Sequence, residues 1–407
     1  MVMQWLNPII NDTANMGHIL LLYSLVIAVG GILGKVKIKG IGFGATLVLF
    51  VGIIAGHFGF TAPLPIINFI QHLGLILFVT CIGIQVGPNF FSSFKKGGTS
   101  MVLASVLLIA LNIMTVLGIQ IMFFNQDDMP MLIGMLCGSV TNTPSLGAAQ
   151  EALAQIGYKG EDIATGYACA YPFAVIGAIM SLVILKYICG SSKASSSKTA
   201  ITEEIAVKAV KEAVASGRFP RKDNSNGVMI AIFVTMIMGI FLGSIPIPIP
   251  GCPVPAKLGL AGGPLVAAIL LGRFGRSLHL DTRVSASANH LLRDLGLAFF
   301  FASVGIKAGD GFVDAVVHGD GLLYMVFGFI VAVLPMLIVG TICNKVMNFN
   351  YDQTMGILAG SCTAPHSLAF ANSTAGNNTP ATTYSMVYPF AMFLRIFSAQ
   401  LLVLLLV

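Results

Sequence analysis

The chain has 407 residues, of which 56% are hydrophobic and only 9% are charged, with a formal net charge of +6 and a mean hydropathy of +0.89. Soluble domains carry roughly 25% charged residues, so this composition excludes a soluble globular protein and predicts an integral membrane protein. The seven cysteines and seven histidines show no metal-ligand spacing and no phosphate-binding loop is present, so no metal site, cofactor or ATP-driven activity is predicted.

Apolar runs long enough to cross a bilayer recur along the whole chain. A spanning helix needs about 20 mainly apolar residues, and five such runs are predicted in each half. The first run lacks the positive flank and cleavage site of a signal peptide, so it is interpreted as a spanning helix. The predicted spans are 17–34, 40–56, 72–88, 101–124 and 166–188, followed by 227–245, 258–274, 293–309, 321–343 and 383–406.

The two halves of the chain repeat each other in sequence. Two long segments align at a separation of 222 residues, as Gly83 and Gly305 illustrate. A duplicated half in a strongly apolar chain is typical of secondary transporters that are built from structural repeats. The repeated segments are 73–87 with 295–309, 134–141 with 356–363, and 171–174 with 388–391.

Between the fourth and fifth spans of each half lies a further apolar segment, 130–155 and 353–378, which a proline interrupts midway. Because proline removes an N–H donor and disfavours helix before it, neither segment can form one straight helix. Each segment is too short to cross the membrane twice, so each is predicted to be a re-entrant hairpin. Irregular backbone at membrane depth must be buried in protein or line a wet cavity.

Five crossings and one hairpin in each half require the halves to have inverted topologies. Lys and Arg gather in the loops predicted to be cytoplasmic, whereas the outer loop 57–71 has neither. The chain is therefore divided into a first inverted repeat (1–190), a cytoplasmic linker (191–226) and a second inverted repeat (227–407), with both termini outside the cytoplasm. The linker is predicted to contain an amphipathic helix on the membrane surface or, alternatively, a helix that binds a partner.

The broken centres of the two hairpins are the strongest candidates for a binding site. A broken helix presents free N–H groups with partial positive charge at the start of its second half, where carboxylates bind. In an inverted repeat the two tips are expected to meet near the bilayer midplane. The alternative is that these residues merely kink a packed helix. The predicted substrate-binding residues are Thr141, Asn142, Thr143, Pro144 and Ser145 in the first tip, and Thr363, Ala364, Pro365, His366 and Ser367 in the second.

Arg395 lies about a dozen residues into the last predicted span, among apolar residues. An arginine at that depth is costly unless it is paired or hydrated, so it marks a functional site. Because a guanidinium matches the geometry of a carboxylate, Arg395 is predicted to bind substrate. The alternative is a snorkelling or internally paired structural arginine. Its counterpart in the first repeat is Ala178, so the charge is not a packing requirement that both repeats share.

Gln85 and Lys307 occupy the same place in the two repeats, beside glycines that permit close helix crossing. Lys307 is predicted to snorkel at a helix end or, alternatively, to attract an anion at the outer mouth. No Asp or Glu falls in the middle of a predicted span, which argues against proton coupling through a buried acid. His366 could still titrate, and sodium coupling through carbonyl and hydroxyl oxygens stays open.

Three motifs, with their repeats, carry a family resemblance: LGLILFVTCIGIQVGPNFF at 73–91, GSVTNTPSLGAA at 138–149 and YPFA at 171–174. In these motifs the chain resembles the aspartate:alanine exchanger family of bacterial transporters. The resemblance implies exchange of small carboxylates or amino acids. The exchange is of aspartate for alanine, or of related solutes such as glutamate and succinate. Members of that family usually carry two soluble regulatory domains between the halves, related to the C-terminal part of potassium-channel regulators, where this chain has only the short linker.

The sequence therefore predicts an all-α membrane protein with ten transmembrane helices and two re-entrant hairpins in a 5+5 inverted repeat. It predicts a transporter of the bacterial inner membrane rather than an enzyme, working by an elevator mechanism in which one bundle carries both tips past a static scaffold. The scaffold is expected to form a homodimer through the first two spans of each half, and no nucleic acid is expected as a partner. The alternatives are a sodium-coupled organic-anion symporter similar to the bile-acid transporter class, and an anion channel.

Overall fold

The computed structural model describes residues 12–90 except 36, 39–40 and 43, residues 98–189 except 161, and residues 225–246, 257–274 and 286–407 except 318. Within these residues the chain is helical apart from two short strands that pair antiparallel. The predicted linker lies outside the described residues apart from its last two positions, which begin a helix.

Every predicted span and both limbs of each predicted hairpin correspond to a helix. The first half contains α2 (Met16–Gly34), β1 (Lys37–Ile38), β2 (Ile41–Gly42), η1 (Gly44–Thr46), α3 (Leu47–His57), α4 (Leu64–Phe90), α5 (Gly98–Phe123), η3 (Gln126–Asp128), α6 (Met129–Ser139), α7 (Thr143–Gln155) and α8 (Ala164–Cys189). The second half contains α10 (Ser225–Ser244), α11 (Gly259–Phe274), α12 (Ala286–Val317), α13 (Gly321–Lys345), α14 (Tyr351–Ser361), α15 (Pro365–Ala375) and α16 (Thr379–Leu406).

Six of the described helices, α2, α4, α5, α8, α13 and α16, are long and apolar enough to cross a membrane. Three further apolar helices, α3, α10 and α11, are shorter in their apolar part. The predicted span 40–56 was placed too early, because α3 begins only at Leu47. Gly42 and Gly44 disfavour a helix in the preceding segment, which forms the strands and η1 instead. The helices support a multi-pass membrane protein, and the count of ten crossings stays a prediction.

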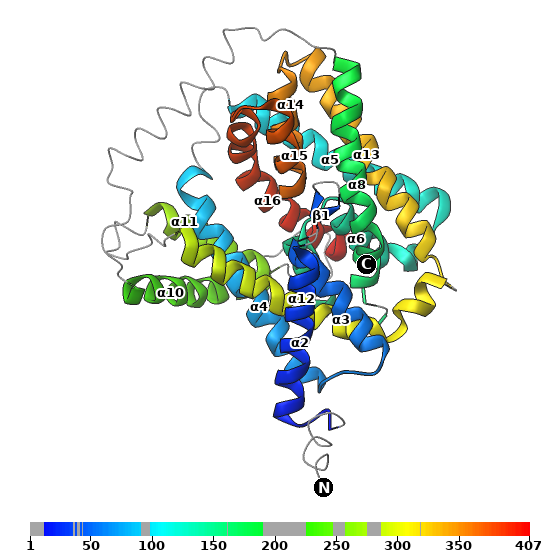
Figure 1. Ribbon diagram of the computed structural model, residues 1–407, viewed down its shortest axis with the longest axis vertical. Coiled ribbons are helices and arrows are strands. Elements are labelled where there is room, and N and C mark those ends of the chain that lie inside the picture. The colour runs from blue at the N-terminus through cyan, green and yellow to red at the C-terminus, as the bar shows by residue number, and fades with distance from the viewer. Residues whose placement is uncertain are drawn as a thin grey trace.

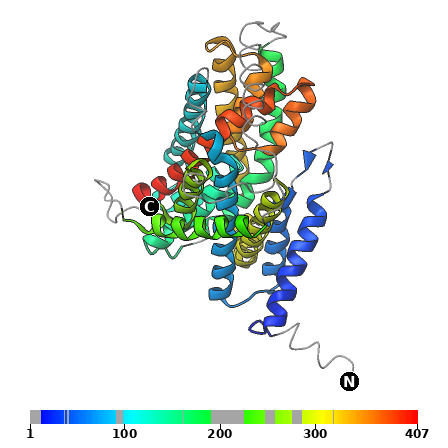
Figure 2. The same cartoon turned by 90° about the vertical axis from the view of Figure 1, so that its left-hand side faces the viewer.

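The helices form two groups, which Figures 1 and 2 show from two sides. The scaffold group consists of α2 to α4 and α10 to α12; within it, α12 packs against α3 and α4, and α11 packs against α4 and α10. The hairpin group consists of α5 to α8 and α13 to α16; within it, α8 packs against α6 and α13, and α14 packs against α16. Each group therefore takes the same helices from both halves of the chain.

Glycines allow the scaffold helices to approach closely. A Cβ atom added to Gly305 of α12 would overlap the backbone of α3, and one added to Gly83 of α4 would overlap Ala268 of α11. Helices α4 and α12 cross where Gly74 faces Gly296, and a Cβ atom at Gly74 would lie 2.6 Å from the carbonyl oxygen of Gly296. Because Gly83 and Gly305 are equivalent in the sequence repeat, the two halves make the same kind of helix contact.

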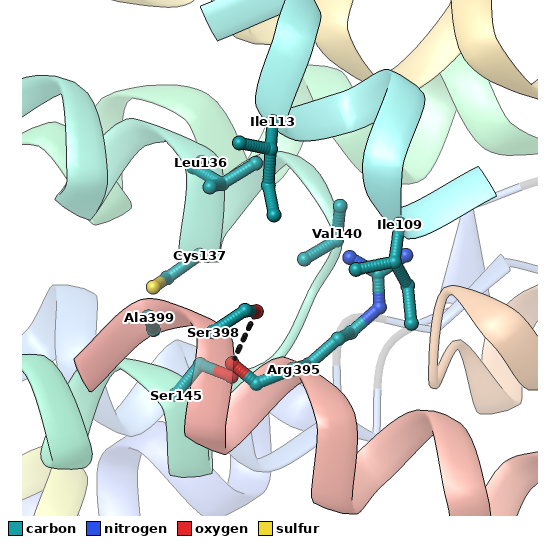
Figure 3. Close-up of a pocket in the computed structure, with 9 residues that line it drawn as sticks. All are labelled: Ile109, Ile113, Leu136, Cys137, Val140, Ser145, Arg395, Ser398 and Ala399. Atoms are coloured by element: carbon teal, nitrogen blue, oxygen red, sulfur yellow. Dashed lines mark hydrogen bonds between the residues drawn. The ribbon is translucent and has the colours of Figure 1, made fainter. Parts of the chain in front are cut away.

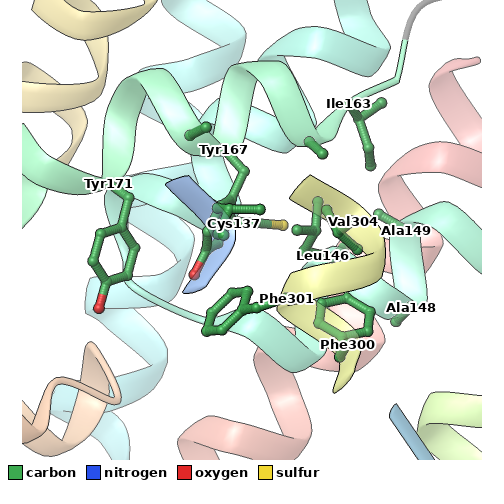
Figure 4. Packing of buried hydrophobic residues seen from close by; sticks show 14 of the residues in the cluster. Cys137, Leu146, Ala148, Ala149, Ile163, Tyr167, Tyr171, Phe300, Phe301 and Val304 are labelled. Carbon is green, nitrogen blue, oxygen red and sulfur yellow. The ribbon is translucent and has the colours of Figure 1, made fainter. Parts of the chain in front are cut away.

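An apolar interface separates the scaffold group from the hairpin group (Figure 4). Phe300, Phe301 and Val304 of α12 belong to the same buried cluster as Leu146 of α7 and Tyr167 of α8. The rings of Phe301 and Tyr167 have centroids 6.4 Å apart. Because apolar packing is not directional, this part of the interface stabilises the observed arrangement through packing alone.

Candidate functional site

The tips of the two hairpins lie against each other, as expected. The hydroxyl of Thr141 donates to the carbonyl oxygen of Cys362 at 3.2 Å, and the side-chain amide of Asn142 donates to the hydroxyl of Thr363 at 3.0 Å. The first tip lies between α6 and α7 and the second between α14 and α15, where the sequence predicts the breaks. Polar side chains from both halves of the chain therefore join at one point.

Helices α6 and α14 end in the same unusual way. At the end of α6, the N–H groups of Thr141 and Asn142 donate to the carbonyl oxygens of Gly138 and Cys137 in a Schellman motif, and equivalent bonds end α14. Thr141 and Thr363 both have φ of 52°, a left-handed conformation in which glycine is usual and a β-branched residue is strained by roughly 1–3 kcal/mol. A glycine would lack the hydroxyls that join the tips, which explains why threonine stands at both positions.

The second helices of the two hairpins begin differently. Asn142 caps α7, because its Oδ1 accepts from the N–H of Ser145 at 2.8 Å and from the hydroxyl of Ser145 at 2.6 Å. The equivalent residue before α15 is Ala364, and α15 has no side-chain cap. The buried hydroxyl of Ser367 and the Nε2 atom of His366 have no hydrogen-bond partner among the described residues.

Arg395 of α16 is buried, with 3% of its surface exposed, so it does not snorkel. Its Nε donates to the carbonyl oxygen of Ser361 at the end of α14 at 2.6 Å, and one terminal nitrogen donates to Oδ1 of Asn112 on α5 at 3.1 Å. Both acceptors are neutral, and no carboxylate of the described residues forms an ion pair with Arg395. Because a buried charge without a counter-ion is costly, the position favours an anion.

A small cavity of about 10 Å³ lies beside Arg395 (Figure 3). The guanidinium points toward Ile109 and Val140, while Ser398 donates a hydrogen bond from its hydroxyl to the backbone oxygen of Arg395 at 3.0 Å. Ser145 of the first tip also lines the cavity, and most of the remaining lining is apolar. This volume is about what one water molecule needs, so the cavity would have to enlarge before a substrate could enter.

Not all predicted site residues face the cavity. Thr143 points instead to α8, where its hydroxyl lies 3.0 Å from the hydroxyl of Tyr167. Pro144 is buried in the first turn of α7 and does not line the cavity, and Pro365 is exposed at the start of α15. The structure thus brings Arg395 and Ser145 to one cavity. The Arg395 side chain contacts the second hairpin by its hydrogen bond to the backbone oxygen of Ser361.

Two ion pairs join the hairpin group to the scaffold group, and we call their four residues the ion-pair latch. Nε2 of His72 on α4 lies 3.6 Å from a carboxylate oxygen of Glu151 on α7. The ammonium of Lys307 on α12 lies 3.4 Å from a carboxylate oxygen of Asp162, just before α8. The amide of Gln150 donates to the other oxygen of Asp162 at 3.0 Å. Lys307 therefore has a fixed partner within the protein.

Asn112, Tyr167 and the latch residue Glu151 were not predicted from the sequence. Asn112 had a usable signal, because it is a polar residue within the apolar run 101–124, and polar residues at membrane depth are commonly functional. Its side-chain amide donates to the carbonyl oxygen of Val331 on α13 at 2.8 Å. This bond fixes the amide of Asn112, whose oxygen in turn accepts from Arg395.

Comparison with known proteins gives a family and several relatives. The family model of a predicted permease membrane region matches residues 22–187 and 231–404. An uncharacterized transporter of Bacteroides thetaiotaomicron is 36% identical over 99% of this chain and 100% of its own, and one of Bacteroides fragilis is 32% identical over 95% and 96%. A putative transport protein of Klebsiella pneumoniae is 30% identical over 93% of this chain and 97% of its own. The first alignment runs over 553 positions against 407 residues here, so that relative has residues without a counterpart in this chain.

Proposed function

Because this chain belongs to the aspartate:alanine exchanger family of membrane permeases, we propose that it exchanges small carboxylates or amino acids across the bacterial inner membrane. Aspartate, alanine, glutamate and succinate are the candidate substrates. The observation that carries the proposal is Arg395, a buried guanidinium at the joined hairpin tips whose hydrogen-bond acceptors are both neutral. A substrate carboxylate would supply the negative charge that the protein does not place there.

The proposed topology has ten transmembrane helices and two re-entrant hairpins, with both termini outside the cytoplasm. The repeats are 1–190 and 227–407, and the linker 191–226 joins them in the cytoplasm. Support comes from the matching glycine contacts of α3 with α12 and of α4 with α11, and from the matching ends of α6 and α14. The first hairpin then enters from outside and the second from the cytoplasm.

In the proposed mechanism, the hairpin group moves past the scaffold group and exposes the tips to each side in turn. The apolar packing of Phe300 and Phe301 against the hairpin group supports such sliding. The two hairpins also differ in packing, because nine residues of α7 are buried but only Ser367 and Ala371 of α15 are. The proposal assigns the arrangement with the first hairpin packed and latched to a state in which the second hairpin faces the cytoplasm.

A homodimer is part of the same proposal, with an interface formed by α2, α3, α10 and α11. The outward side chains of these helices, such as Leu20, Phe233 and Phe241, are apolar and suit either lipid or a second copy. Chemical cross-linking in native membranes tests the interface, and a protein that stays monomeric there would contradict it.

Uptake of labelled aspartate into sodium-free proteoliposomes tests the proposed function. We expect uptake only into vesicles preloaded with an unlabelled substrate. The binding site of an exchanger crosses the membrane in either direction only while a substrate is bound. Varying the internal solute among alanine, glutamate and succinate then ranks the substrates. Uptake into empty vesicles that requires sodium would instead show a symporter, and substrate-independent conductance would show an anion channel.

A further inference from the structure

The first hairpin satisfies the donors at its own helix N-terminus. Oδ1 of Asn142 accepts from both the N–H and the hydroxyl of Ser145, and Nδ2 of Asn142 is bound to Thr363 of the other tip. An N-cap of this kind fills the position at which a helix N-terminus would otherwise attract an anion. The start of α7 is therefore occupied by an oxygen atom of the protein itself.

The second hairpin lacks this side-chain oxygen. Ala364 stands where the first hairpin has Asn142, and no side chain caps α15. Ser367 corresponds to Ser145 in the repeat, so its N–H and hydroxyl are the counterparts of the two donors that Oδ1 binds in the first hairpin. The Ser367 side chain is 0% exposed and its hydroxyl has no partner among the described residues, and Nε2 of neighbouring His366 has none either. A buried hydroxyl without a partner is destabilising, so folding alone does not explain this arrangement.

We infer that the N-terminus of α15 is where the transporter holds a carboxylate group of its substrate. The carboxylate takes the place that the Asn142 oxygen takes in the first hairpin and accepts from the N–H and hydroxyl of Ser367. The partial positive charge of the helix N-terminus favours an anion there over a cation. Arg395 adds positive charge to the same hairpin, because it is bonded to Ser361. This inference rests on the proposed function. It gives the two tips different roles: the first tip supports the structure, and the second tip binds the substrate carboxylate.

The packing of α15 fits a site that opens and closes. Pro365 at its start is exposed, two residues before the buried Ser367. Because Ser367 and Ala371 are its only residues that are buried, α15 itself is less tightly packed than α7.

The variant Ala364→Asn tests the inference by building the first hairpin's cap into the second. The new side chain would accept from Ser367 and compete with the substrate. For the full chain in proteoliposomes, we expect the KM for labelled aspartate to rise about tenfold or more while the temperature of thermal unfolding rises. Ser367→Ala is expected to raise the KM without that rise in unfolding temperature, because it removes a ligand and adds no cap.

Ala369→Asn is the matched control, since it adds the same side chain to an exposed position of α15 away from the helix start, and its KM is expected to equal that of wild type. A stabilised Ala364→Asn variant with an unchanged KM would contradict the inference, because a formed cap would then not compete. If that variant does not fold, Ala364→Ser carries the same expectation with a smaller cap. Failure of wild type to exchange aspartate, alanine, glutamate or succinate would contradict the proposed function itself.

Discussion

Arg395 is held by two oxygen atoms that orient its charge without neutralising it. The carbonyl oxygen of Ser361 and the amide oxygen of Asn112 fix the guanidinium beside an apolar cavity. Charge is weakly screened in such surroundings, so Arg395 attracts an anion more strongly there than at a water-exposed position. The account therefore makes this residue the main source of selectivity for anions.

Replacing Arg395 with Gln removes the charge but keeps a side chain that can bond to Ser361. We expect kcat/KM for aspartate exchange to fall by roughly 100-fold or more, because the loss removes a charge-assisted contact to the carboxylate. Arg395→Lys keeps the charge and loses the planar fork, so a smaller loss is expected. Initial rates in proteoliposomes measure both, with gel filtration as the check on folding. Wild-type rates in Arg395→Gln would remove this residue from the site.

Single residues were predictable where they break a pattern. Arg395 interrupts an apolar run, and the prolines of the two hairpins interrupt two others, so both features are visible in the sequence. The partners of Arg395 were not predictable, because Asn112 lies 283 positions away and the Ser361 contact uses the backbone. Contacts of this kind depend on how helices pack, which hydropathy does not specify.

Substitutions of Thr141 test whether its hydroxyl helps to join the two tips. Thr141→Val keeps the branched shape and its backbone strain but loses the bond to Cys362, so we expect a loss of about 1 kcal/mol in the free energy of unfolding and slower exchange. Thr141→Gly also loses the bond but relieves the strain, so its stability is expected to stay closer to wild type. Thermal unfolding in detergent compares the two. Equal destabilisation by both variants would mean that strain at this position is negligible.

At the scale of helices, hydropathy located the elements well because each spanning helix must be apolar along its whole length. The predicted start of α3 was wrong, because the glycines before Leu47 disfavour a helix in a segment that is otherwise apolar. The difference between Asn142 and Ala364 was already visible in the aligned repeats, yet its meaning required the observed cap on α7. The ion-pair latch could not be predicted, since its residues come from four separate segments of the chain.

Glu151→Gln removes the negative charge from one half of the latch. We expect α7 and the segment leading to α8 to exchange amide hydrogen several times faster, because the ion pair with His72 no longer holds α7 to α4. Hydrogen–deuterium exchange by mass spectrometry measures this. Asp294→Asn is the control, because Asp294 is exposed and its ion-pair partner among the described residues is the adjacent Arg293 on α12. Unchanged exchange in Glu151→Gln would mean that apolar packing alone holds the first hairpin.

At the scale of the whole molecule, the scaffold depends on glycines that no larger residue can replace. Gly305→Ala would push a methyl group into the backbone of α3, so we expect the free energy of unfolding to fall by about 1–3 kcal/mol. Gly31→Ala on α2 is the control, because a Cβ atom there meets nothing within 4 Å, and no loss is expected. Thermal unfolding of the purified variants compares them. A Gly305→Ala protein as stable as Gly31→Ala would contradict the close crossing.

The sequence predicted one bundle that carries both hairpin tips and a scaffold that contains the first two spans of each half, but not which side chains meet between them. Each half contributes helices to both the scaffold group and the hairpin group, so neither group corresponds to a continuous stretch of chain. The interface between the groups is built from apolar side chains of α7, α8 and α12, which in the sequence resemble any other apolar side chains. Its position became evident only from the packing.

Movement of the hairpin group against the scaffold group is the central claim, and a reversible cross-link tests it most directly. Lys307→Cys and Asp162→Cys place thiols where the two groups form an ion pair of 3.4 Å. Five cysteines are buried, and the other two, Cys189 and Cys252, would be replaced by serine. We predict that a reducible bifunctional thiol reagent stops aspartate exchange in the double variant but not in either single variant, and that reduction restores it. Exchange that continues at the unlinked rate while the two thiols are joined would contradict the account.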